Sequence, residues 1–152
     1  MRRILLTLAV ALFSVTAPVS PATAADVRHS PARHPGPSPR VLAIEQLLDH
    51  RQRLQSEATT ALGVFATRLH LTLQQMMDKW QRVAVCEVDG RWNMVGPIYS
   101  GIGFLNINWI HFGGTHFGAR AGDATPVQQV LVAMRITQTW IPDQYGCSPL
   151  GW

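Results

Sequence analysis

The sequence predicts a mainly helical domain with one disulfide, and three observations favour this fold class. Apolar residues recur at three- and four-residue steps between residues 41 and 86, which is the period of an α-helix. A further helix entrance is marked at Thr125. Two cysteines, Cys86 and Cys147, predict a disulfide if the chain reaches an oxidising compartment. With 152 residues, 47% of them hydrophobic, the chain can bury one core but not two.

The first 24 residues have the three parts of a secretory signal. Arg2 and Arg3 form the charged start, residues 4–19 are mainly apolar, and a small-residue site ends at Ala24. The alternative is a transmembrane anchor, but polar residues and a proline interrupt the segment, and it is shorter than the roughly 20 apolar residues that span a bilayer. We therefore expect a signal peptide at 1–24, secretion, and no stable membrane anchor after its cleavage.

Residues 25–40 are predicted to be a disordered leader, because they are rich in proline and carry almost no apolar side chains. The net charge of the chain is +4, and it falls to +2 once the two arginines of the signal are removed. The remaining arginines are spread along the chain. A weak and scattered positive charge argues against nucleic acid as a partner.

Residues 41–79 are predicted to be a helical segment, either one long helix or two shorter ones with a break at Gly63. A heptad coiled coil is the alternative, but charged residues do not flank the apolar stripe regularly. The segment is also a candidate surface for a protein partner. Residues 80–152 follow as the compact domain.

Two later stretches complete the helical reading. The alternating residues 104–109 predict either a strand or a short helix between glycine-rich turns. Thr125, Pro126 and Gln128 form a capping box, and the apolar face of the helix that it opens continues to about Gln138. Pro142 is expected to prevent further helix.

An acidic residue stands at the end of the first apolar stripe. Glu87 follows Trp80 and Val83 at helical steps, so its carboxyl is expected to point with the apolar face. Asp89 and Gly90 form a stop signal, which places Glu87 at the negative end of the helix. Both surroundings disfavour a charged carboxylate and predict a proton donor, the group that cleaves glycosides. The alternative is that Glu87 turns into solvent at a frayed helix end.

The residues around Glu87 resemble the resuscitation-promoting factor family. The spacing Trp-x5-Cys-Glu-x2-Gly-x-Trp begins at Trp80, and further matches lie at residues 99–104, Trp109, 112–114 and 124–129. Members of this family are secreted actinobacterial proteins that cleave peptidoglycan, and their domain is similar to lysozyme and the lytic transglycosylases. The resemblance covers about residues 78–149.

The resemblance implies a lysozyme-like, mainly helical compact domain with a disulfide from Cys86 to Cys147. It also implies that Glu87 is the catalytic acid and that the domain binds peptidoglycan glycan strands at the cell wall, with no cofactor.

The resemblance further implies a groove lined by aromatic residues. Trp92, Tyr99 and Trp109 match aromatic positions of the family, and Asn108 stands where the family has a threonine. Flat aromatic faces suit sugar rings, and core packing is the alternative role of each aromatic residue. The chain departs from the family at Gly103, where a glutamine is usual, and at Val88, where a small residue is usual.

The reaction class follows from the count of nearby acids. Hydrolysis needs a second carboxylate, and Asp89, the nearby candidate, is expected to project to the other side of the helix. A lytic transglycosylase needs only one carboxyl group, because the attacking group is the 6-hydroxyl of the muramic acid itself. The pattern favours transglycosylation, and a noncatalytic peptidoglycan-binding protein on the same scaffold is the alternative. His111 and His116 have no acid or cysteine at metal-site spacing, so no metal is expected.

Overall fold

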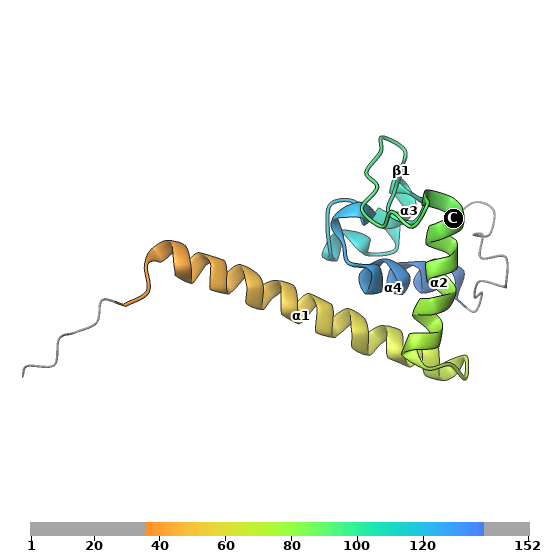
Figure 1. Cartoon of the computed structure of the whole chain (residues 1–152), viewed down its shortest axis with the longest axis horizontal. Helices are drawn as coiled ribbons and strands as arrows, with labels where there is room; N and C mark the ends of the chain where they lie inside the picture. Colours follow the sequence, from red (N-terminus) through yellow and green to blue (C-terminus); the bar gives the residue numbers. More distant parts are fainter. Residues whose placement is uncertain (1–35, 139–152) are drawn as a thin grey trace, which may run out of the picture. The chain divides into compact units, whose positions relative to one another are not determined.

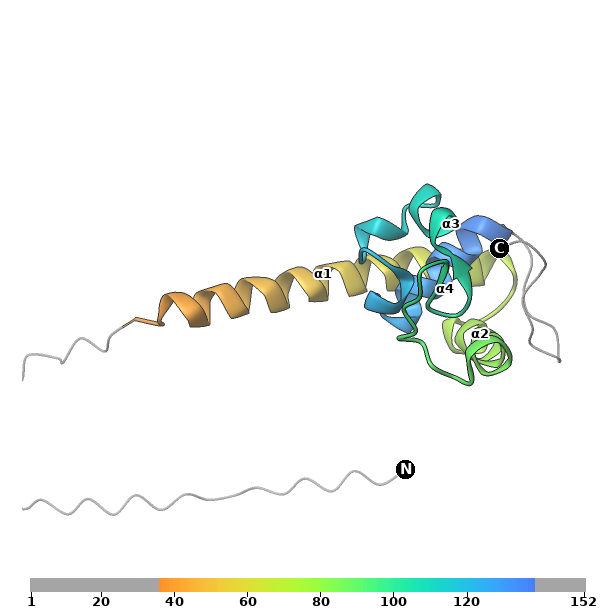
Figure 2. The ribbon, with the colours of Figure 1, turned by 90° about the horizontal axis from the view of Figure 1, so that it is seen from above.

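A computed structural model of the chain describes residues 36–138, and Figures 1 and 2 show the arrangement of its elements. The described residues are mainly helical, as predicted. The predicted signal and the residues Pro142 and Cys147 lie outside the described part. In chain order the elements are α1 (Pro39–Arg68), α2 (Leu73–Val88), β1 (Tyr99–Ser100), β2 (Phe104–Leu105), α3 (Asn106–His111), η1 (Gly114–His116), η2 (Ala121–Asp123) and α4 (Pro126–Thr137).

Helix α1 is 30 residues long and begins two residues before the predicted change of composition at Val41. The side chain of Ser38 accepts a hydrogen bond from the Val41 amide, and Pro39 occupies the first turn. Both features are typical of helix entrances. Gly63 lies inside α1, so the predicted break at that residue was wrong.

The break between α1 and α2 falls at residues 69–72. His70 adopts a left-handed φ of 56°, and Thr72 then opens α2 with a capping box to Gln75. The Gln75 side chain accepts from the Thr72 amide at 2.8 Å, and the Thr72 hydroxyl accepts from the Gln75 amide at 3.1 Å. The side chains of Thr72 and Gln75 satisfy backbone amides that would otherwise lack a partner at the start of α2. One glycine inside a helix costs only about 1 kcal/mol, so Gly63 does not end α1. Residues 73–79, assigned above to the N-terminal segment, therefore belong to the helix that carries Glu87.

The core is formed where α1, α2 and α4 pack together. Helix α4 contacts both other helices, and α2 runs steeply across the direction of α1 (Figures 1 and 2). The predicted capping box at Thr125 is confirmed. All residues of α4 from Gln128 to Met134 are buried, so this helix is enclosed on every side rather than on one face. The second half of α1 contributes fully to this core through Ala58, Leu62 and Ala66.

A short antiparallel hairpin covers one end of the helical core. Tyr99 pairs with Leu105, and Ser100 pairs with Phe104. The predicted choice between strand and helix at residues 104–109 resolves into both, because β2 passes directly into α3. The hairpin turn consists of residues 101–103.

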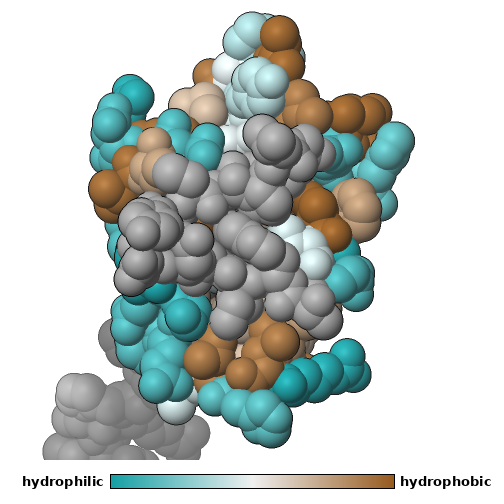
Figure 3. All heavy atoms as spheres, turned by 90° about the vertical axis from the view of Figure 1, so that its right-hand side faces the viewer, coloured by the Kyte–Doolittle hydropathy of each residue, from teal (hydrophilic) through white to brown (hydrophobic). Residues whose placement is uncertain are grey.

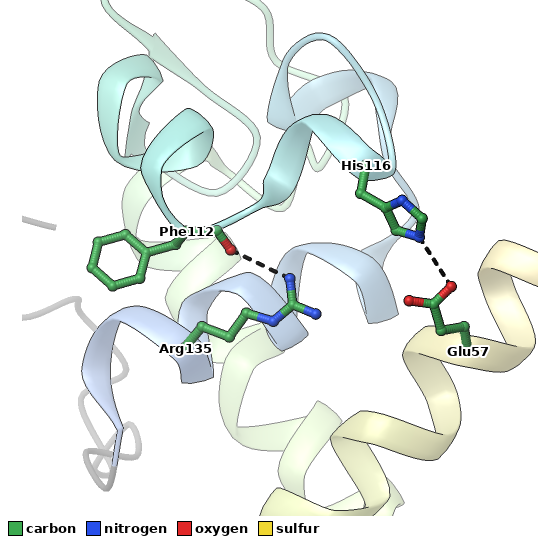
Figure 4. A network of polar contacts seen from close by, with 4 residues as sticks. All are labelled: Glu57, Phe112, His116 and Arg135. Carbon is green, nitrogen blue, oxygen red and sulfur yellow. Dashed lines mark hydrogen bonds and ion pairs between the residues drawn. The ribbon is translucent and has the colours of Figure 1, made fainter.

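Two polar contacts fix the segment from α3 to η1 onto the helices (Figure 4). The His116 Nε2 lies 2.9 Å from Glu57 Oε2 of α1, and both side chains are about half exposed. The Arg135 guanidinium of α4 donates to the Phe112 carbonyl at 3.3 Å. Among residues 36–138, no group of three or more potential metal ligands comes together.

None of the helices between residues 36 and 138 combines the length and the apolar character needed to cross a membrane.

Candidate functional site

Glu87 occupies the last turn of α2, as the stop signal predicted. The helix ends at Val88, and Asp89 follows in the left-handed conformation with a φ of 53°. The expectation that Glu87 points with the apolar stripe was wrong. Its side chain is exposed, whereas Val88 is buried. The buried stripe of α2 continues from Ala84 to Val88, four residues on, so the Glu87 carboxyl lies at the edge of the core.

The hairpin turn lies directly against Glu87. A Cβ atom built on Gly103 would stand 3.6 Å from the Glu87 Oε2 and 3.6 Å from its Cβ, which is ordinary van der Waals contact. The φ of Gly103 is +108°, a conformation that L-residues rarely adopt. The departure from the family's glutamine therefore has a local consequence, because bare backbone faces the carboxyl at this position.

Gln129 holds the hairpin turn in this place. Its side chain is fully buried, and its Oε1 accepts from the Ile102 amide at 3.1 Å. Its Nε2 donates to the Trp92 carbonyl at 2.9 Å and to the Ala124 carbonyl at 3.0 Å. One amide thus joins α4 to the turn beside Glu87 and to the segment that follows α2. A buried side chain that satisfies three backbone groups fixes their relative positions, since breaking any of these bonds leaves a desolvated polar group.

A second polar cluster fixes the outer loop before β1. The hydroxyl of the fully buried Ser100 donates to Asn106 Oδ1 at 2.6 Å and accepts from the Ala121 amide at 3.1 Å. The Asn106 Nδ2 donates to the carbonyls of Gly96 and Pro97, both at 3.1 Å. The loop that leads to Tyr99 is therefore anchored by Asn106 at the start of α3, which accepts a hydrogen bond from Ser100 of the hairpin.

Sequence reasoning missed this supporting role of Gln129, Ser100 and Asn106. Apart from the bond between Ser100 and Asn106, their partners are backbone atoms, which leave no trace in residue spacing. The one available signal was the pair Gln128-Gln129 at the start of an otherwise apolar helix, since a polar residue within a buried run requires a partner.

The predicted aromatic site residues have different environments. Trp92 is half-buried, and its indole nitrogen donates to Gln81 Oε1 on α2 at 3.0 Å. Tyr99 is 50% exposed on β1. Asn108 is half-buried on α3. These three side chains remain partly open to solvent on the elements that border the hairpin.

The predicted contact of Trp109 with substrate requires correction. Trp109 is 0% exposed, and its ring lies 5.4 Å from that of Phe104. Its indole nitrogen donates to the Gly118 carbonyl at 3.0 Å. A Cβ atom on Gly114 would stand 2.2 Å from the indole, so backbone covers one ring face. Trp109 is a core residue, because no ring face is open to a sugar.

The second candidate carboxylate, Asp89, serves the end of α2. Its carboxylate lies 3.7 Å from the Arg91 guanidinium, and its side chain is 88% exposed. This position matches the expected role of Asp89 in closing the helix. Asp89 therefore supplies a carboxylate two residues after Glu87, and this carboxylate is largely exposed to solvent.

The outer face of α2 is hollowed close to the candidate acid. A depression of about 370 Å³ is lined by Gln81, Arg82, Val85 and Cys86, and Val85 is 57% exposed. The side of the molecule that lies to the right in Figure 1 carries hydrophobic patches between hydrophilic ones (Figure 3). Cys147, the predicted partner of Cys86, lies outside the described residues, so the pairing stays a prediction.

Two comparisons with known proteins return a match that includes the region around Glu87. Residues 75–146 match the family model of the transglycosylase-like domain, a range that includes Glu87, the hairpin and α4. The chain is also similar to resuscitation-promoting factor Rpf1 of Corynebacterium glutamicum, with 35% identity over 81 residues. No solved structure matches the chain.

Residues 75–146, from α2 to beyond the end of α4, are thus similar to the transglycosylase-like domain. The two matches support the resemblance to the resuscitation-promoting factor family that was drawn from the motifs. The aligned region covers 51% of this chain and 42% of the relative.

Proposed function

We propose that this protein cleaves the β-1,4 bond between N-acetylmuramic acid and N-acetylglucosamine in peptidoglycan, as a lytic transglycosylase that uses Glu87. The observation that carries the proposal is the position of Glu87 at the end of α2 against the Gly103 backbone, within the matched domain. A carboxyl at the rim of a fixed turn can reach a substrate in solution. A fully buried one could not.

The reaction needs one side-chain acid. The protonated Glu87 carboxyl gives its proton to the glycosidic oxygen, and the bond to the anomeric carbon of the muramic acid breaks. The 6-hydroxyl of the same sugar then bonds to that carbon and returns its proton to Glu87. The product carries a 1,6-anhydro ring, no water is consumed, and the carboxyl is restored. The exposure and the Arg91 contact of Asp89 agree with a mechanism that has no second carboxylate.

The groove is proposed to involve Trp92, Tyr99 and Asn108. The two aromatic rings are partly exposed and can stack on sugar rings, and the Asn108 amide can donate and accept hydrogen bonds. Tyr99 in β1 and Asn108 in α3 come before and after the turn along the chain, and Gln129 bonds both the turn and the Trp92 carbonyl. The substrate implies that the protein acts outside the cell and at the wall, in agreement with the predicted signal peptide.

The experiment compares the protein with its Glu87→Gln variant on purified peptidoglycan, with released fragments analysed by mass spectrometry for anhydro ends. Glu87→Gln is expected to lower the release of anhydro fragments by at least about 100-fold, since general acid–base catalysis contributes 10²–10⁴-fold. Asp89→Asn is the matched control, because it removes an exposed carboxyl two residues away, and it is expected to retain most of the activity. Equal release by the protein and by Glu87→Gln would contradict the proposal.

A noncatalytic peptidoglycan-binding protein on this scaffold is the second candidate. The changes at Val88 and Gly103, where the family has a small residue and a glutamine, favour it, because Gly103 leaves backbone in place of a polar side chain beside Glu87. Sedimentation with insoluble peptidoglycan separates the two functions. Binding that is retained in Glu87→Gln, without anhydro products from either protein, would assign the second function.

A further inference from the structure

Trp92 is fixed to α2 by a hydrogen bond that neither partner needs for its own solvation. Its indole nitrogen donates to Gln81 Oε1 at 3.0 Å. Gln81 is exposed and Trp92 is half-buried, so water could hydrogen-bond both groups if this bond were broken. The indole of Trp109 differs, because that residue is fully buried and its nitrogen needs the Gly118 carbonyl as acceptor. The bond from Trp92 to Gln81 therefore sets the direction of a ring more than it offsets desolvation.

The chain reversal after α2 returns Trp92 to the side of this helix. Asp89 and Gly90 have φ values of 53° and 76°, and both lie in the left-handed region. A Cβ atom on Gly90 would stand 3.8 Å from Gln81 Nε2, so the returning backbone passes close to that side chain. Farther along the chain, the Gln129 Nε2 donates to the Trp92 carbonyl at 2.9 Å. Gln129 thus fixes the main chain of Trp92, and Gln81 fixes its ring.

Gln81 stands on the same helix as the proposed proton donor. It lies six residues before Glu87, which is about 9 Å along the axis of an α-helix. Both side chains are exposed, and the hydrogen bond to Gln81 holds the Trp92 ring relative to the same helix. A flat ring that is fixed relative to the acid offers a sugar a defined plane and a defined distance from the carboxyl.

We propose that Gln81 is a positioning residue, which orients the Trp92 indole so that a sugar ring of the glycan strand stacks on it. This inference rests on the proposed function, because it takes the glycan strand as the substrate. Without the Gln81 oxygen, the indole could turn about its two side-chain torsions, and substrate binding would have to order it at a cost in affinity. Gln81 acts through Trp92 and not on the reacting bond, so its loss should weaken binding and leave the chemical step unchanged.

Support of packing is the alternative role of this hydrogen bond. Trp92 is partly buried and packs against the hydrophobic core. If the bond served only that packing, its loss would lower the stability of the domain and would not change the affinity of the folded molecules. A hydrogen bond between partly exposed groups contributes little to stability, so the affinity of folded molecules separates the two roles.

The first experiment measures KM and kcat of Gln81→Leu on soluble peptidoglycan glycan strands, from the release of anhydro ends. KM should rise about fivefold with kcat unchanged. Binding of the strands is measured separately in a Glu87→Gln background, where turnover is absent, and the dissociation constant should rise by the same factor. Gln74→Leu is the matched control, because Gln74 is an exposed glutamine on the same face of α2 whose amide donates to Asp78 at 2.7 Å instead. It should leave both constants unchanged.

Three further variants test the hydrogen bond itself. Gln81→Glu keeps an acceptor oxygen, so it should bind the strands like the unchanged chain at about 0.5 M salt, where the added charge is screened. Trp92→Phe keeps a ring but lacks the donor, and it should weaken binding. Adding Gln81→Leu to Trp92→Phe should cause no further loss, because the bond is already absent. In NMR spectra, the Trp92 indole N–H should exchange with water faster in Gln81→Leu than in the unchanged chain.

Three results would overturn the inference. The first is equal affinity of Gln81→Leu and the unchanged chain for glycan strands, and the second is additive losses in the double variant. The third is a loss of affinity in Gln81→Leu that only equals its loss of folded protein, which would assign the bond to packing. Failure of the proposed function has a different signature, since the unchanged chain would then release no anhydro ends while its binding of glycan strands would still depend on Gln81.

Discussion

The helical core and the region around the hairpin are stabilised by different means. Between α1, α2 and α4 the contacts are apolar, and side chains such as Leu62, Met76 and Leu131 are almost completely buried. Around the hairpin, buried polar side chains such as Gln129 and Ser100 bind backbone groups of loops. The free energy of apolar packing is roughly proportional to the buried area and changes little with small shifts, whereas hydrogen bonds require defined directions. The first region therefore supplies stability, and the second positions the groups next to Glu87.

The largest effect is expected from a truncation in the helical core. Leu62→Ala should lower the free energy of unfolding by about 3 kcal/mol, because it leaves a cavity at a fully buried position. Denaturant unfolding measures this value. Leu47→Ala on the exposed half of the same helix is the control, and it should change stability by less than about 0.5 kcal/mol. Equal effects of the two variants would show that α1 does not belong to the domain core.

A smaller loss of stability with a larger loss of activity is expected at Gln129. Gln129→Leu should cost about 2 kcal/mol, since it removes the partners of buried backbone groups. Activity on peptidoglycan should fall further than the folded fraction, because the turn beside Glu87 loses its anchor. The neighbouring Gln128→Leu removes only a helix cap and should leave the activity per folded molecule unchanged. Equal activity per folded molecule in both variants would remove the distinction between the two regions.

A still smaller cost is expected at the turn itself. Gly103→Ala should lower stability by about 1 kcal/mol, because alanine is strained at a φ of +108°. The added methyl group lies 3.6 Å from the Glu87 carboxyl oxygen, so activity should be affected more than stability. Kinetics on peptidoglycan combined with thermal unfolding tests this expectation. It would be contradicted by an activity that follows the folded fraction alone.

The smallest effect is expected for the contact between α1 and η1. Glu57→Gln should change stability by less than about 1 kcal/mol, because the Glu57–His116 pair is about half exposed and solvent screens it. Denaturant unfolding at low and at high salt would measure it. A loss of several kcal/mol would mean that surface charge, and not apolar packing, holds α1 to the domain.

The helices could be predicted because their signals are local. The capping box at Thr125 and the stop at Asp89 were both correctly identified from adjacent residues. The break at residues 69–72 was missed, because Gly63 is a more visible signal than the left-handed His70. The exposure of Glu87 was expected only as the alternative, because the sequence does not decide where the stripe of α2 meets the hairpin. The same limit applies to Trp109, whose burial is decided by Gly114 and Phe104.

The close approach of Gly114 to the Trp109 ring predicts how the domain tolerates variation. Even one methyl group at residue 114 would overlap the indole, so a comprehensive mutational scan would find this position as intolerant as the proposed proton donor. Intolerance at residue 114 would then report steric exclusion rather than chemistry. For each essential position of this domain, the atoms around it decide whether it is constrained by packing or takes part in the reaction.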